Sequence, residues 1–153
     1  MGAPAAGRVA VMSIKPQYTE AILAGTKLVE FRKRRLAPDV STVLMYATMP
    51  VAKVVGAFEI VGYDVASPTV VWERHKSHAG IARAGYREYY RGATSAVGIL
   101  LRDARRLARP LTLAELDVNL SVPQSFVYLT LNPHGANGIA QAQLHDEPTS
   151  ALD

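Results

Sequence analysis

The sequence predicts a single α+β domain in which about six β-strands, separated by short helices, curl into a barrel. Runs of β-branched or alternating residues recur along the chain, and segments with helical spacing and Pro- or Gly-containing turns lie between them. At 153 residues, 49% of them hydrophobic, the chain is long enough for one core. Gly56, inside one strand segment, suits the bulge or close backbone approach that a curled sheet requires.

The chain begins with a predicted strand and helix. Residues 8–14 are largely apolar and indicate a buried strand. Pro16 suits the first turn of a helix, and Gly25 suits the left-handed residue that ends one. A short helix is therefore expected between these two residues.

A second strand is predicted over residues 27–34, where the pattern changes to period two. The alternation places Lys27 on one face and Glu30 and Arg32 on the other. Because unpaired buried charge is costly, these side chains must pair, reach solvent or bind an anionic ligand.

The same patterns continue to residue 131. Strands are expected over residues 42–47, 54–63, 93–101 and 126–131, helices over 68–75 and 81–90, and one helical turn between 112 and 116. Ser67 and Thr112 are expected to cap helices, since both side chains can accept from a backbone N–H of the first turn. Residues 1–7 are expected to be flexible and 132–153 to form a disordered tail, which leaves a domain at 8–131.

Composition limits the possible functions. Seventeen basic against thirteen acidic residues give a net charge of +4, which is compatible with binding nucleic acid. The chain has no cysteine, so disulfides, thiolate metal sites and a cysteine nucleophile are excluded. Neither the four scattered histidines nor any other pattern predicts a metal site or a cofactor. The sequence predicts no signal peptide or membrane span, and a cytoplasmic location is expected.

The segment Gly25-Thr26-Lys27-Leu28-Val29-Glu30-Phe31-Arg32 fits the motif G-x-K-x-x-E-x-R and resembles the ASCH domain family. The resemblance extends over residues 9–130, through Ser13-Ile14-Lys15-Pro16, Tyr46-Ala47-Thr48 with Pro50, Val55-Gly56 and Pro123-Gln124-Ser125-Phe126. The chain is similar to bacterial and archaeal ASCH proteins described as predicted transcriptional regulators. This resemblance implies a PUA-like pseudo-barrel and the binding of RNA or a modified nucleotide.

The resemblance also implies a site in a cleft between the first helix and the barrel. Lys27 and Arg32 would contact a phosphate or a base edge there, with Glu30 accepting from a base or orienting both cations. The remaining candidates would extend the basic surface, stack a base or hydrogen-bond to one: Lys15, Arg34, Tyr46, Trp72, Gln124 and Ser125. The alternatives are a structural ion-pair network, core aromatics and turn capping.

Two enzymatic alternatives stay open at this point. ASCH-like enzymes that deacetylate N4-acetylcytidine use a Lys, Thr and Glu set, of which Lys27 matches the lysine, whereas Glu30 stands where the threonine would be. Glu73 and Glu88 are the candidates for the third member. A nuclease is the other alternative. The sequence leaves the oligomeric state and the choice between RNA and DNA open.

Overall fold

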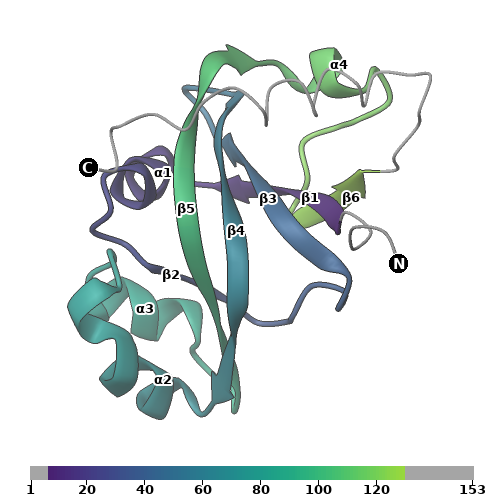
Figure 1. Cartoon of the computed structure of the whole chain (residues 1–153). Coiled ribbons are helices and arrows are strands. Elements are labelled where there is room, and N and C mark those ends of the chain that lie inside the picture. The colour runs from purple at the N-terminus through teal and green to yellow at the C-terminus, as the bar shows by residue number, and fades with distance from the viewer. Residues whose placement is uncertain (1–6, 130–153) are drawn as a thin grey trace.

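The computed structural model describes residues 7–129, which form one mixed sheet of six strands with short helices around it (Figure 1). The strands are β1 (Arg8–Ile14), β2 (Val29–Arg32), β3 (Val40–Ala47), β4 (Lys53–Ala66), β5 (Ala96–Leu111) and β6 (Phe126–Leu129). The helices are α1 (Pro16–Leu23), α2 (Pro68–His75), the 3₁₀ turn η1 (Lys76–His78), α3 (Arg83–Tyr89) and α4 (Leu113–Leu116). The α+β class and the strand number are as predicted.

The strands lie in the order β2-β5-β4-β3-β1-β6, so β2 and β6 are the two edges. β1 and β3 run parallel, and the other neighbours are antiparallel. The long β4–β5 pair has three register shifts, which bend and twist it. No backbone ladder joins β2 to β6, so the strands do not close into a barrel; the α+β pseudo-barrel predicted for this chain fits the open sheet.

Most predicted elements are present, but several boundaries differ. The expected strand 27–34 shrinks to β2, because the backbone N–H of Lys27 donates to Ala21 at the end of α1 and that of Leu28 donates to His78. β4 and β5 extend past their predicted ends because they pair with each other along their length. The caps at Ser67 and Thr112 are confirmed, and Gly25 has the positive φ of a helix end.

Three hydrophobic clusters hold these elements together. The largest lies between α1 and the sheet, and a second packs α4 and neighbouring residues against the sheet. The third packs α2 and α3 onto β2 through edge-to-face and tilted ring contacts. The ring centroid of Tyr86 lies 4.8 Å from those of Phe31, Trp72 and Tyr90. The α2–α3 segment therefore lies at one end of the β4–β5 pair and α4 at the other (Figure 1).

The predicted flexible start and the predicted tail from residue 132 lie outside the described residues, apart from Gly7. The domain limits 8–131 therefore stay a prediction at both ends. None of the helices within residues 7–129 has the length and apolar character needed to cross a membrane.

Gly56 allows β4 to approach its neighbours closely. A Cβ atom at this position would lie 2.6 Å from the backbone oxygen of Arg105 on β5 and 3.0 Å from Leu23 on α1. Backbone and helix both occupy the space a side chain would need, and register shifts flank the residue in both strand pairs. This confirms the close approach predicted for Gly56.

We predict that Gly56→Ala lowers the free energy of unfolding by about 1–3 kcal/mol, since the backbone of β5 must move to admit the methyl group. Gly62→Ala is the matched control on the same strand, because nothing lies within 4 Å of its added Cβ. This control is expected to leave stability unchanged or to raise it by less than about 1 kcal/mol. Urea denaturation of both variants measures the difference, and equal effects would contradict the packing argument.

Candidate functional site

The cavity that contains the predicted charged residues has a volume of about 220 Å³ and lies between α1, β2 and α3. We call it the α1–α3 cleft. Lys27, Glu30 and Arg32 line it together with Lys15 and Tyr18 from the start of α1. Its other lining residues come from β1, β2, the turn before α3, and α3 itself: Ser13, Ile14, Phe31, Ile81, Gly85, Tyr86 and Tyr89. The structure thus brings together the three motif residues that the sequence singled out.

Arg32 and Glu30 form a buried ion pair on the same face of β2. Nη2 and Nε of Arg32 donate to Glu30 Oε2 at 2.8 and 3.1 Å. Nη2 also donates to the backbone oxygen of Ser13 on β1 at 2.7 Å, and Nη1 donates to Ser125 Oγ, one residue before β6, at 3.0 Å. One guanidinium therefore connects edge strand β2 to β1 and to the segment that leads into the opposite edge strand.

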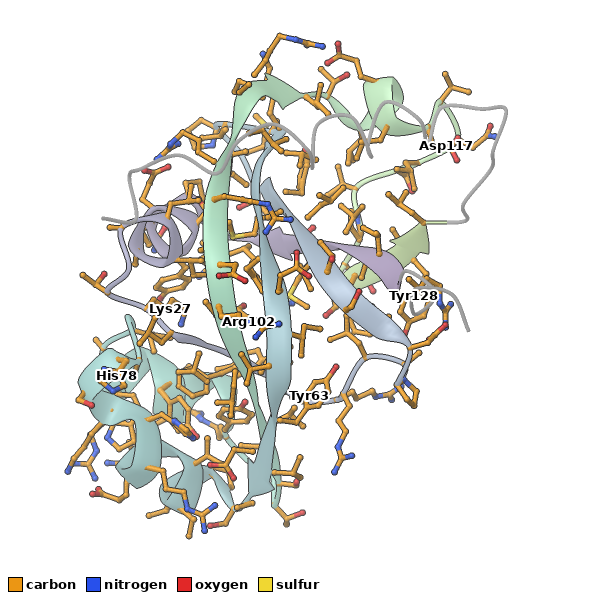
Figure 2. The ribbon with its side chains drawn as sticks, in the orientation of Figure 1. Lys27, Tyr63, His78, Arg102, Asp117 and Tyr128 are labelled. Atoms are coloured by element: carbon orange, nitrogen blue, oxygen red, sulfur yellow. The ribbon has the colours of Figure 1, made fainter. Side chains whose placement is uncertain are left out.

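Lys27 joins this pair from outside the strand. Its side chain is 2% exposed, and Nζ donates to the backbone oxygen of Ala79 at 2.6 Å and lies 3.7 Å from Glu30 Oε1. Nζ also lies 5.3 Å from the ring centre of Tyr18 and 4.9 Å from that of Phe31. Burial lowers the pKa of Lys27, and the Glu30 carboxylate opposes that shift. Figure 2 shows Lys27 between α1 and the helical segment α2–α3.

The turn before α3 covers Lys27. Gly80 has a φ of +63°, and a Cβ atom there would lie 2.5 Å from Cβ of Lys27. Only glycine fits that backbone conformation and that contact at once. Sequence reasoning missed this turn, although Gly80 was a signal of an irregular backbone between two helices.

A second hollow, of about 480 Å³, adjoins the cleft, and we call it the β2 hollow. It shares Arg32 and Tyr89 with the cleft. Its other lining residues are Lys33, Arg34, Gln124, Ser125 and Phe126. The predicted residues Arg34, Gln124 and Ser125 therefore lie next to the predicted cleft.

Tyr46 and Trp72 do not line either of these cavities. Tyr46 is 5% exposed and points into the core. Side chains alternate along a strand, so Met45 belongs to the cluster beside α1 and Tyr46 to the cluster beside α4, on the opposite face of β3. Trp72 lies between α2 and α3, 9% exposed, against Tyr86. Tyr89, which is 40% exposed and lines both cavities, is the aromatic residue that sequence reasoning missed. The spacing between Tyr86 and Tyr89 indicated a helix. It did not indicate that this helix packs against β2, which is what brings Tyr89 to the site.

The carboxylates considered for an amidohydrolase lie outside the cleft. Glu73 pairs with Lys76 and Glu88 pairs with Arg91, both at exposed positions. Nor does any group of three or more His, Asp or Glu side chains within residues 7–129 form a metal-binding arrangement. His75 instead pairs with Asp64 at 2.7 Å, and His78 contacts Ser77.

The cleft has a net positive floor. Lys27 and Arg32 share the single carboxylate of Glu30, so one positive charge stays uncompensated when all three groups are ionised. These groups are largely buried, whereas Lys15, Lys33 and Arg34 at the edges are exposed. The arrangement suits an anionic ligand that lies over the floor and contacts the exposed cations.

The chain is similar to individual known proteins, although no protein-family model matches it. An ASCH domain-containing ribonuclease from Zymomonas mobilis is 35% identical over 124 residues, covering 78% of this chain and 83% of the relative. A 120-residue part of ATP synthase subunit alpha from Ureaplasma parvum is 32% identical, but this chain covers only 15% of that protein.

The structural comparison agrees with the sequence comparison. The crystal structure of ASCH from Zymomonas mobilis matches with a TM-score of 0.74 and 34% identity, over 80% of this chain and 87% of that one. A mutant of that protein matches with a TM-score of 0.78 over 91% of this chain and 97% of that one, at 29% identity. The N-terminal domain of Staphylothermus marinus McrB, at 11% identity and a TM-score of 0.52, shares the fold alone.

We predict that Arg32→Met lowers the free energy of unfolding by about 3 kcal/mol, because it leaves the buried Glu30 carboxylate without its main partner. Arg8→Met is the matched control, since Arg8 and Asp39 form an ion pair at the same 2.8 Å but at the exposed surface. That variant is expected to change stability little. Urea denaturation measures both, and a similar loss in the two variants would contradict a special role for Arg32.

The stability contributed by Lys27 is predicted to depend on pH. Burial places the pKa of Lys27 in the folded chain below its ordinary value of 10.5, so between these two pKa values the unfolded chain binds more protons. Wild-type stability therefore gains from Lys27 deprotonation as pH rises through that window, and Lys27→Met lacks this gain. The stability of Lys27→Met relative to wild type should fall as pH approaches 10.5.

Urea denaturation between about pH 7 and pH 10 measures that difference. Lys76→Met, at an exposed lysine, is the control and should show a constant difference from wild type over this range. A constant difference for Lys27→Met as well would show that burial does not shift its pKa.

Proposed function

The chain belongs to the ASCH domain family, and we propose that it binds RNA along the groove formed by the α1–α3 cleft and the β2 hollow. The name of the Zymomonas mobilis relative, an ASCH domain-containing ribonuclease, supports RNA as the ligand. The observation that carries the proposal is that the two cavities adjoin at Arg32 and Tyr89. The groove thus contains a positive floor, exposed cations and an exposed aromatic ring next to one another.

Each part of the groove suits one part of an RNA strand. The exposed Lys15, Lys33 and Arg34 are placed to contact phosphates, which supply most of the affinity for nucleic acid. The Tyr89 ring offers a face on which an unpaired base stacks, and Lys33 Nζ lies 4.9 Å from its centre. Gln124 provides an amide that can hydrogen-bond to a base edge.

The buried residues have a different role in this proposal. Lys27, Glu30 and Arg32 fix the floor of the cleft, and their net charge attracts the strand. Ser125 belongs to the same framework, because its hydroxyl accepts from Arg32. A function in transcription and a cytoplasmic location stay predictions.

A second candidate function is RNA cleavage, which the name of the relative favours. Attack by the 2′-hydroxyl on the adjacent phosphorus requires a group that accepts the hydroxyl proton and one that protonates the leaving 5′-oxygen. Lys27, whose pKa is lowered by burial, and the neighbouring Glu30 are the titratable groups of the cleft floor suited to these steps. A lowered pKa makes the neutral amine available closer to neutral pH.

The amidohydrolase alternative, acting on N4-acetylcytidine through Lys27 and Glu30, has less support. In the family's Lys, Thr and Glu set the threonine offers a hydroxyl, whereas two hydroxyls that line the cleft here are already donating. Ser13 Oγ donates to Pro123 at 2.7 Å and the Tyr86 hydroxyl donates to Pro68 at 2.7 Å. Glu30, in the place of the family's threonine, is held by Arg32.

The double variant Lys33→Gln/Arg34→Gln is predicted to bind single-stranded RNA roughly tenfold more weakly than wild type, because two phosphate contacts are lost. The dependence of log affinity on log salt should flatten by about 1.4. Arg102→Gln/Arg109→Gln is the control with the same charge change on β5, beyond the residues that pair with β2, and it should bind nearly as wild type. Fluorescence anisotropy with a labelled oligonucleotide at several salt concentrations measures these values, and equal weakening in both variants would reject the groove.

Lys27→Met is predicted to reduce RNA cleavage by a factor of about 100 or more, with a much smaller loss of RNA affinity from the one floor charge that it removes. Lys76→Met should retain both properties. Gel analysis of end-labelled RNA measures cleavage, and unchanged cleavage in Lys27→Met would remove Lys27 from the chemistry. Release of acetate from N4-acetylcytidine, lost in Lys27→Met, would instead favour the amidohydrolase.

A further inference from the structure

A third cavity, of about 350 Å³, lies between α2 and α3, and we call it the α2–α3 pocket. It shares only Tyr86 with the α1–α3 cleft. The buried rings of Trp72 and Tyr90 form its apolar floor. Exposed polar side chains stand around it: Thr69 from the first turn of α2, and Arg83 and Arg87 from α3. The proposed RNA groove uses none of these three polar residues.

Arg83 and Arg87 differ from the other basic side chains of the helical segment. Neither guanidinium makes a hydrogen bond or an ion pair with another residue in the range 7–129. The other arginines and lysines between residues 68 and 91 each have a carboxylate partner: Arg74 with Asp64, Lys76 with Glu73, and Arg91 with Glu88. Arg83 also lowers the pKa of Glu73, but Lys76 does so more strongly. Within residues 7–129, the two pocket arginines therefore have no carboxylate in direct contact.

The spacing of the two arginines adds to this imbalance. Residues four apart lie on the same side of a helix, so the charges of Arg83 and Arg87 repel each other. A guanidinium fork pairs best with the oxygens of a phosphate or carboxylate, and an anion between the two would remove the repulsion. The aromatic floor next to them offers a flat apolar surface, which a nucleoside covers and a simple carboxylate does not.

We propose that the α2–α3 pocket binds a phosphate group of a nucleotide, with Arg83 and Arg87 on the phosphate oxygens and the nucleoside against Trp72 and Tyr90. The phosphate comes either from a free mononucleotide or from an RNA strand. This site is separate from the RNA groove and does not depend on its function.

Trp72 allows a direct test, because it is the only tryptophan of the chain and lies on the pocket floor. Its emission and its indole N–H resonance are followed while the full-length protein is titrated with inorganic phosphate, uridine 5′-monophosphate or an oligouridylate. The pocket variant is Arg83→Gln/Arg87→Gln. The matched control is Arg74→Gln/Arg91→Gln, which removes the same charge from the same helical segment but outside the pocket.

Saturable changes at Trp72 are expected with phosphate and the mononucleotide, weakened on the order of tenfold or more in the pocket variant and nearly unchanged in the control. The pocket variant should melt no lower than wild type, since it loses a like-charge repulsion. If only the oligouridylate changes Trp72, and the pocket variant abolishes that change, the phosphate is supplied by RNA.

Three results would overturn the inference. One is a Trp72 signal that none of the probes changes. Another is equal affinity in the pocket variant and wild type. The third is an RNA response lost in Lys33→Gln/Arg34→Gln but kept in the pocket variant, which would support the groove and reject this site. Conversely, a Trp72 response that is lost only in the pocket variant, together with an RNA affinity that Lys33→Gln/Arg34→Gln leaves unchanged, would reject the proposed function alone.

Discussion

The hydrogen bonds of the Arg32 guanidinium are the contacts on which the architecture of the site depends. The six-stranded sheet is open, because its two edge strands, β2 and β6, do not pair with each other. Arg32 reaches from β2 to Ser13 on β1 and to Ser125 before β6, and Glu30 neutralises the charge that this reach buries. Because a buried cation without such partners is costly, the pair fixes the distance between the strands on either side of the groove.

The opposite wall of the cleft, α3, is held in place by aromatic packing and two hydroxyl groups. The Tyr90 hydroxyl donates to the backbone oxygen of Arg32 at 2.7 Å, which ties α3 to the strand that carries the guanidinium. The Tyr86 hydroxyl donates to Pro68 at the start of α2, and burial raises the pKa of Tyr86 to about 12, so this donor keeps its proton at neutral pH. The cleft is therefore built on a rigid frame before any ligand arrives.

The charges are divided between this frame and its surface. Lys27 and Arg32 share one carboxylate in the floor, while the exposed cations lie at the edges of the two cavities. The buried groups supply a fixed positive field and the exposed groups supply adaptable contacts. The α2–α3 pocket has a different design, with two guanidiniums that have no ion-pair partner among residues 7–129 and an aromatic floor beside them. Tyr86 forms part of both walls, so α3 presents a basic cavity on each of two sides.

The sequence alone determined the local features. Proline at the start of α1, glycine at its end and the capping residues Ser67 and Thr112 each depend on neighbours in the chain or on backbone geometry, so residue type was enough to predict them. Gly56 indicated a close approach, but not that β5 and α1 are the segments that approach it. The motif also identified Lys27, Glu30 and Arg32 as one group.

Only the tertiary structure decided how that group is used. Strict alternation placed Lys27 and Glu30 on opposite faces, but the end of α1 takes the backbone N–H of Lys27, so β2 starts at Val29 and the lysine is free to turn toward the carboxylate. Other features of the site involve contacts between residues far apart in the chain. These are the turn at Gly80 that covers Lys27, the wall formed by Tyr89, the position of Trp72 outside the cleft and the open edges of the sheet. Such contacts follow from how helices and strands pack, which side-chain periodicity within one element does not specify.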